Sequence, residues 1–183
     1  MTAGFGIQHE EMPNLAPGDP YAHATQLWIN LPSASKLMPP RYQDLTRAAV
    51  PHFTPREGVD VALYSGSVCG TTSPTLNVVP VLAALVRLAP GSEVSLAPIP
   101  LEHQGFLYVL EGAASIGPAG QPASLVGGQA AVLPPAGSGT AGESELALRS
   151  AGNAELVAMV FLGQPIAEPV VQRGPFVMCS VAE

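Results

Sequence analysis

The stretch YVLEGAASIGPAGQPASLVGGQAAVLPP at residues 108–135 decides the fold. Short apolar runs alternate in it with turns that contain Gly and Pro, which predicts the order strand, turn, strand, glycine turn, strand. Gly and Pro also interrupt the rest of the chain. With 19 Gly and 20 Pro in 183 residues, the sequence leaves little room for long helices. We therefore expect an all-β protein of short strands, arranged as a sandwich or a small barrel.

Outward from this stretch, further apolar runs are bounded by the same turn signals. The expected strands cover residues 26–31, 59–64, 77–88 with a break at Pro80, 93–96, 105–111, 130–133, 145–149 and 156–162. The segment between residues 32 and 55 differs, since it holds five prolines and three of the seven basic residues. It has the composition of a connector between domains.

Composition sets limits on function. The hydrophobic fraction is 47% and the mean hydropathy is +0.29, so the chain can bury a core. A net charge of −7 repels phosphate backbones and anionic lipid surfaces, which argues against direct nucleic-acid or membrane partners. No phosphate-binding loop or dinucleotide glycine fingerprint occurs in the sequence.

The cysteines and the apolar runs of the sequence indicate the cellular compartment of the protein. Cys69 and Cys179 lie far apart and form no metal-binding spacing, so two buried thiols are expected rather than a zinc site or a disulfide. No charged segment followed by an apolar one stands at the start of the sequence. The longest apolar run, residues 78–89, contains Pro80 and Arg87 and is too short to span a bilayer. We expect a cytoplasmic protein.

A pair of candidate metal ligands stands near the start, in MTAGFGIQHEEM at residues 1–12. If this segment is extended, residues two apart point to the same face, so the His9 imidazole and the Glu11 carboxylate converge while Glu10 faces away. Such a pair can bind a divalent metal ion, but rarely without further ligands.

The other histidines carry weaker signals. His103 lies beside Glu102 and could be a lone ligand or a general base, but a single imidazole without a convergent partner is more often a surface or hydrogen-bonded residue. His23 and His52 follow the His9 segment, and neither belongs to an H-x-H motif. Packing or solvent contact is the favoured interpretation of both.

The stretch at residues 108–135 resembles the core hairpins of the cupin barrel, a jelly-roll type of fold. Metal-binding cupins carry an H-x-H, then a Glu, then a Gly seven positions after that Glu, and a later His. Gly112 takes the glycine position, but Gly105 stands where the Glu would be, with Leu101 and Ile99 near the His positions. The resemblance therefore implies a metal-free cupin domain.

A more specific resemblance is to the pirin family. It rests on five blocks in order, which are MTAGFGIQHEEM at 1–12, QLWINLP at 26–32, MPPRYQDL at 38–45, FLYVLEG at 106–112 and EPVVQRGPFVM at 168–178. Pirins are bicupins whose N-terminal barrel holds one iron through three histidines and a glutamate, while the C-terminal barrel is metal-free. The resemblance identifies His9 as the third histidine and Glu11 as the glutamate ligand, and it implies that Glu11 is also the catalytic base.

The resemblance also implies what is missing. The first two histidines of the family come from an H-P-H-R-G segment, which this sequence lacks. Because the family writes the first residues as W-M-T-A-G, we expect a chain truncated at its N terminus. The implied layout is a remnant of the N-terminal cupin domain at 1–31, a connector at 32–55, the metal-free C-terminal cupin domain at 56–163 and a tail at 164–183.

Function follows from the resemblance as an expectation. The intact family member would bind Fe(II) or another divalent metal and could be a quercetin 2,3-dioxygenase acting on a flavonol-like small molecule. With half of the metal site, this chain is expected to bind metal weakly or not at all and to be inactive alone. The alternatives are a non-catalytic, iron-linked regulatory or protein-binding module, or an inactive fragment. Unpaired edges in residues 1–31 are expected to promote self-association.

Overall fold

The computed structural model of the chain describes residues 1–12, 18, 21, 23–117, 122–137 and 142–182. The chain divides into two compact units. The smaller comprises Met1–Gln43 and Ile166–Glu183, and the larger is Asp44–Pro165. In the described part of the chain, no helix has both the length and the apolar character needed to cross a membrane.

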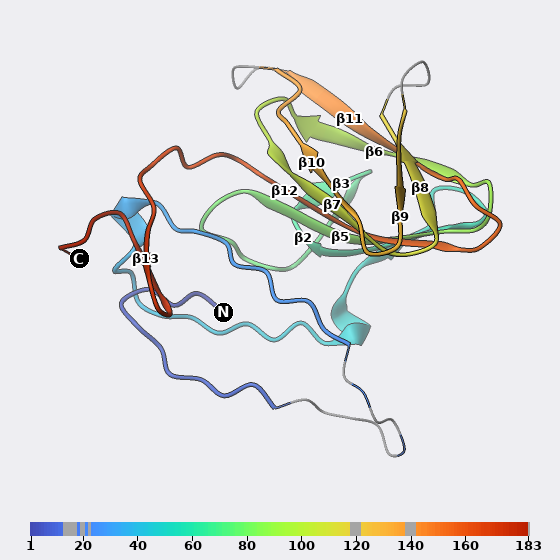
Figure 1. Cartoon of the computed structure of the whole chain (residues 1–183). Helices are drawn as coiled ribbons and strands as arrows, with labels where there is room; N and C mark the ends of the chain where they lie inside the picture. The colour runs from blue at the N-terminus through green and yellow to red at the C-terminus, as the bar shows by residue number, and fades with distance from the viewer. Residues whose placement is uncertain (13–17, 19–20, 22, 118–121, 138–141, 183) are drawn as a thin grey trace. The chain divides into compact units, whose positions relative to one another are not determined.

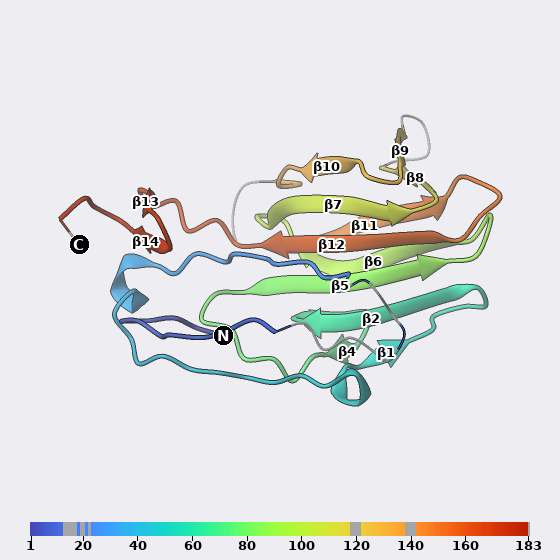
Figure 2. The ribbon, with the colours of Figure 1, turned by 60° about the horizontal axis from the view of Figure 1, so that its bottom comes forward.

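The larger unit is built on a six-stranded antiparallel sheet (Figures 1 and 2). In spatial order its strands are β1 (His52–Phe53), β2 (Val59–Ser65), β5 (Val81–Leu88), β12 (Leu156–Gly163), β7 (Gln104–Glu111) and β10 (Ala130–Leu133). Strand β12 therefore pairs with β5 on one side and with β7 on the other, although both neighbours lie far from it in the sequence.

A second, four-stranded antiparallel sheet covers one face of the first (Figure 2). Its strands in spatial order are β6 (Glu93–Pro100), β11 (Glu143–Ser150), β8 (Ala113–Ile116) and β9 (Ala123–Val126). A short ladder joins β3 (Ser67–Val68) to β4 (Thr71–Thr72). Because the chain passes repeatedly from one sheet to the other, the two layers are connected in the manner of a jelly roll.

The core lies between the two sheets. Alternate residues of each strand point inward, so Leu63 of β2, Leu107 of β7 and Val160 of β12 meet Leu96 of β6 and Leu148 of β11 in one buried cluster. Each of these side chains is almost fully buried, and burial of one such leucine contributes about 1.5–3 kcal/mol. The hydrophobic contact between the layers is what makes the larger unit one body.

Two glycines of β7 and its following turn allow the backbone to approach β12 closely. A Cβ atom on Gly105 would lie 1.9 Å from the carbonyl oxygen of Phe161. Gly112 has φ +78°, and a Cβ there would lie 2.3 Å from the carbonyl oxygen of Glu155. Any side chain at either position would collide with the neighbouring backbone, so both positions require glycine.

The all-β expectation is confirmed, and strands form at seven of the eight expected ranges. The structure extends the expected strand at 93–96 to Pro100, and it adds β1, which falls within the segment expected to be a connector. The prediction of a strand at 26–31 is wrong, because no described residue forms a β-ladder with this segment. The turn at 118–121 lies outside the described residues. The division into remnant, connector, cupin domain and tail stays a prediction.

The smaller unit joins the N-terminal segment to the end of the chain. The tail forms a hairpin of β13 (Val171–Arg173) and β14 (Phe176–Met178). The buried Lys36 donates its Nζ hydrogens to the carbonyl oxygen of Val177 at 2.7 Å and to the Asn30 side chain. The Ser33 backbone N–H donates to Glu168 Oε2 at 2.6 Å, and this bond lowers the pKa of the Glu168 carboxyl. The tail therefore has polar anchors on residues 30–36.

The glycine requirement at the turn after β7 is testable by two alanine substitutions. Gly128 also has a positive φ, +84°, but no atom lies within 4 Å of the place that its Cβ would take, so Gly128→Ala measures the backbone strain alone. We expect Gly128→Ala to cost about 1–2 kcal/mol of unfolding free energy. Gly112→Ala adds the collision with Glu155 and should cost more than about 4 kcal/mol. Urea unfolding of both variants checks this, and equal losses would contradict the close approach.

Candidate functional site

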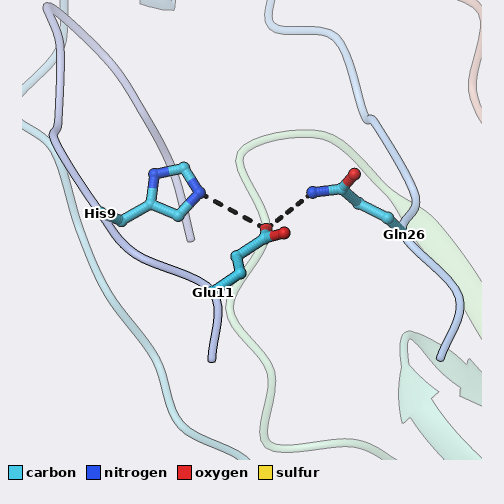
Figure 3. Close-up of polar contacts among 3 residues, drawn as sticks. All are labelled: His9, Glu11 and Gln26. Atoms are coloured by element: carbon cyan, nitrogen blue, oxygen red, sulfur yellow. Dashed lines mark hydrogen bonds and ion pairs between the residues drawn. The ribbon is translucent and has the colours of Figure 1, made fainter. Parts of the chain in front are cut away.

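His9 and Glu11 lie in an irregular segment of the smaller unit, and their side chains point toward one another (Figure 3). His9 Nε2 is 3.5 Å from Glu11 Oε1, and the two side chains are 43% and 66% exposed. The segment is not a β-strand, but the spacing of two residues still brings the imidazole and the carboxylate together. Both groups are accessible to a small cation from solvent.

Gln26 completes this arrangement from a distant part of the sequence. Its Nε2 donates a hydrogen bond of 2.7 Å to Glu11 Oε1, the same oxygen that faces His9 (Figure 3). An amide that holds a carboxylate oxygen fixes the orientation of that carboxylate, as groups surrounding a metal ligand commonly do. The sequence does not predict that Gln26 contacts Glu11. The two residues are 15 positions apart, and Gln26 belongs to no motif that is typical of metal ligands.

The donor set fits part of a divalent metal site. An imidazole nitrogen and a carboxylate oxygen are the ligand types that Fe(II) and similar ions take, and a separation of 3.5 Å lets one ion contact both. A facial triad needs a third protein ligand. Among the described residues, no group of three or more His, Cys, Asp or Glu side chains is arranged to hold a metal ion. These residues therefore account for two ligands and not for a complete centre.

The remaining histidines lie elsewhere. His23 is exposed, and His52 Nδ1 lies 3.1 Å from Asp60 Oδ1 on the surface of the larger unit. His103 is half-buried in the turn before β7, where its backbone N–H donates to the Pro100 carbonyl oxygen at 3.0 Å. That the larger unit is metal-free stays a prediction.

Burial gives His103 an unusual electrostatic environment. Loss of solvent lowers the pKa of its imidazole below the ordinary value of 6.5, and the neighbouring Glu102 carboxylate opposes the shift without cancelling it. The imidazole is therefore neutral at pH 7. Its Nδ1 atom and Glu102 Oε2 are both buried without a hydrogen-bond partner among the described residues.

The fold defines the class of protein. Two facing antiparallel sheets with jelly-roll crossovers, and a glycine turn after β7, make the larger unit a cupin domain. Residues 83–183 match the family described as "Pirin C-terminal cupin domain". The chain belongs to the pirin family.

Known proteins support this assignment along nearly the whole chain. The chain is 38% identical to "Pirin" of Homo sapiens, over 97% of this chain and 57% of that protein. It is also 38% identical to a "Pirin-like protein" of Solanum lycopersicum, over 100% of this chain and 58% of the relative. A crystal structure of quercetin 2,3-dioxygenase from Acinetobacter baumannii is similar with a TM-score of 0.71 and 28% identity, covering 85% of this chain and 50% of that one. The chain thus spans less than two thirds of the length of these relatives.

The lowered pKa of His103 predicts a pH dependence of stability. As the pH falls below 6.5, the unfolded chain takes up a proton at this histidine before the folded chain does, so the free energy of unfolding decreases. His103→Asn should reduce the loss of stability between about pH 7 and about pH 5.5. Urea unfolding at both pH values measures this. His23→Asn is the exposed control, and an equal effect of the two substitutions would contradict the assignment to His103.

Proposed function

We propose that His9 and Glu11 are two ligands of a divalent metal centre, with Fe(II) as the first candidate, and that the complete centre belongs to an enzyme of the quercetin 2,3-dioxygenase type. The convergence of the two side chains at 3.5 Å supports the metal ligands. The similarity to the Acinetobacter baumannii quercetin 2,3-dioxygenase supports the reaction class. A flavonol-like small molecule is the corresponding substrate.

Each of the three residues has a role in this proposal. His9 binds the ion through Nε2, and Glu11 binds it through its carboxylate, which the Gln26 amide holds in place. Gln26 acts through Glu11 and is a positioning residue. The Glu11 carboxylate is well exposed, so it can exchange a proton with a bound hydroxyl and serve as a general base. The iron would supply binding of the substrate and of oxygen.

The described residues provide two ligands, so the 183-residue chain should bind metal weakly and should not turn over a flavonol alone. The remaining ligands would have to come from residues outside the described part or from another chain. A chain with the complete ligand set is the form in which we expect dioxygenase activity.

Metal titration tests the two ligands directly. Anaerobic Fe(II) and, in parallel, Co(II) are added to the chain, and binding is followed by calorimetry and by the Co(II) absorption spectrum. We expect His9→Ala and Glu11→Gln each to weaken binding about tenfold or more, which is about 1.4 kcal/mol. Gln26→Ala should weaken it less, because it removes only the orientation of the carboxylate.

His23→Ala is the matched control, since it removes an exposed histidine of the same unit that lies outside the pair. An equal loss in His23→Ala, or no loss in His9→Ala, would refute the proposed ligands. Quercetin added with Fe(II) and oxygen tests the reaction class, and turnover by the 183-residue chain would show that the ligand set is complete.

A second candidate function is protein binding, which the surface of the smaller unit favours. This unit exposes a set of large hydrophobic side chains, namely Phe5, Met12, Tyr21, Trp28, Ile29, Leu37 and Tyr42. Exposed apolar side chains mark an interaction surface where they lie next to one another in one patch. We propose that this set contacts another protein surface, and that a second copy of the chain is the partner when no other is present.

The Trp28 side chain is a built-in reporter of such contacts, because it is 55% exposed and is the single tryptophan of the chain. Raising the protein concentration should move its emission to shorter wavelength while light scattering reports a larger mass. Ile29→Glu should weaken association about tenfold, since it places a charge in the contact. Val132→Glu is the control, an exposed valine of the larger unit. A monomer at all concentrations would refute self-association.

A further inference from the structure

The first residues of the chain are held against a later stretch of the smaller unit by backbone hydrogen bonds. The Thr2 N–H donates to the Arg41 carbonyl oxygen at 2.7 Å, and the Arg41 N–H donates to the Thr2 carbonyl oxygen at 2.9 Å. The Phe5 N–H donates to the Met38 carbonyl oxygen at 3.0 Å, so the contact is antiparallel. We call these two stretches together the N-terminal clamp, residues 2–5 and 38–41.

Gly4 allows the two stretches of the clamp to come this close. Its φ is +53°, and a Cβ atom there would lie 2.0 Å from the Met38 carbonyl oxygen, the same atom that accepts the hydrogen bond from Phe5. A side chain at this position would push the two backbones apart. The clamp therefore requires glycine at position 4.

The later stretch of the clamp is stiff. Met38 is followed by Pro39 and Pro40, and each proline fixes its own φ. Each also restricts the residue before it to extended conformations. The Met38 carbonyl and the Arg41 backbone groups, on either side of the two prolines, therefore have little freedom to turn away from the first residues of the chain.

The proposed metal ligands follow directly after the clamp. The Gly6 N–H donates to the Ala3 carbonyl oxygen at 2.9 Å, which closes a turn at the end of the first stretch. Further along the chain, the Glu11 carboxylate is held by the Gln26 amide at 2.7 Å. His9 lies between these two anchors, so the course of its backbone is restrained from both sides.

We propose that the N-terminal clamp is a positioning element that holds the His9 imidazole against the Glu11 carboxylate, with Gly4 as its positioning residue. Its use in metal binding rests on the proposed function, whereas the contact between His9 and Glu11 does not. Without the clamp, the segment that carries His9 would lose its fixed start. A metal ion would then have to order this segment on binding, and affinity would fall.

Nuclear magnetic resonance tests the positioning without any metal. The imidazole ¹⁵N signals of His9 are recorded in the parent chain and in Glu11→Gln. The substitution should move these signals, because Glu11 Oε1 lies 3.5 Å from His9 Nε2. In a Gly4→Ala chain, Glu11→Gln should leave the His9 signals nearly in place, because the two side chains no longer meet. The signals of His52, which belongs to the larger unit, serve as the internal reference.

Gly174→Ala is the matched control. Gly174 belongs to the same unit and has a φ of +59°, but no atom lies within 4 Å of the place that its Cβ would take. This variant introduces similar backbone strain without a collision, so the response of His9 to Glu11→Gln should persist. Thr2→Pro is a second clamp variant, which removes the N–H that donates to Arg41 and leaves Gly4 unchanged. It should reduce the response as Gly4→Ala does.

Titration with Co(II) extends the test to the metal. Gly4→Ala and Thr2→Pro should each weaken binding about tenfold, while Gly174→Ala should not. At saturating Co(II) the clamp variants should give the absorption spectrum of the parent chain, because the ligands are the same. A clamp that only keeps the unit folded would instead be recognised by the loss of this spectrum in both variants.

The outcomes separate this proposal from the proposed function. It is overturned if the parent chain shows no response of His9 to Glu11→Gln, if both clamp variants keep the full response, or if Gly174→Ala removes it as well. Should Gly4→Ala unfold the smaller unit, Thr2→Pro carries the decision. A parent chain that shows the His9 response and its loss in the clamp variants, but binds no Co(II), supports the positioning and refutes the metal function.

Discussion

The ladder between β7 and β12 is the contact on which the larger unit depends. Strand β12 lies in the middle of the six-stranded sheet, and its pairing with β7 continues from Gln104 to Glu111. The two backbones approach so closely at Gly105 that a single methyl group there would overlap the Phe161 carbonyl. Because β7 begins directly after Glu102 and His103, this ladder also sets where those two side chains sit at the end of the sheets.

Much of this architecture could be predicted from the sequence, for a physical reason. Strands in the middle of a sheet are buried on both faces, so their apolar runs are long and distinct, as in LVAMVFLG of β12. The segments at 26–31 and 52–53 show the limit of such reasoning. The first is apolar but forms no ladder with the described residues, whereas the second pairs with β2 despite its ordinary composition. Strand pairing depends on a neighbouring strand that is distant in the sequence, and a local sequence pattern does not identify that neighbour.

In the candidate sites, too, local sequence patterns predict some contacts and not others. A spacing of two residues suffices to bring His9 and Glu11 together, so their convergence is accessible to sequence reasoning. Gln26 reaches the same carboxylate from 15 positions away, and no motif predicts it. For His103 the sequence favours a surface or hydrogen-bonded role, because the sequence offers this single imidazole no convergent partner. The structure places it instead beside a cavity with a buried polar atom unsatisfied, and burial of a single atom cannot be inferred from composition.

Solvent exposure distinguishes the histidines of the two units. The His9 and Glu11 side chains are open to water, which screens their charges and competes for hydrogen bonds, so they can hold a strongly interacting metal ion but offer little to a neutral molecule. Water is excluded from Glu102 Oε2 and from His103 Nδ1, and neither atom has a hydrogen-bond partner among the described residues. Burial rather than residue type therefore distinguishes the two histidines, since His9 is open to water whereas burial lowers the pKa of the His103 imidazole.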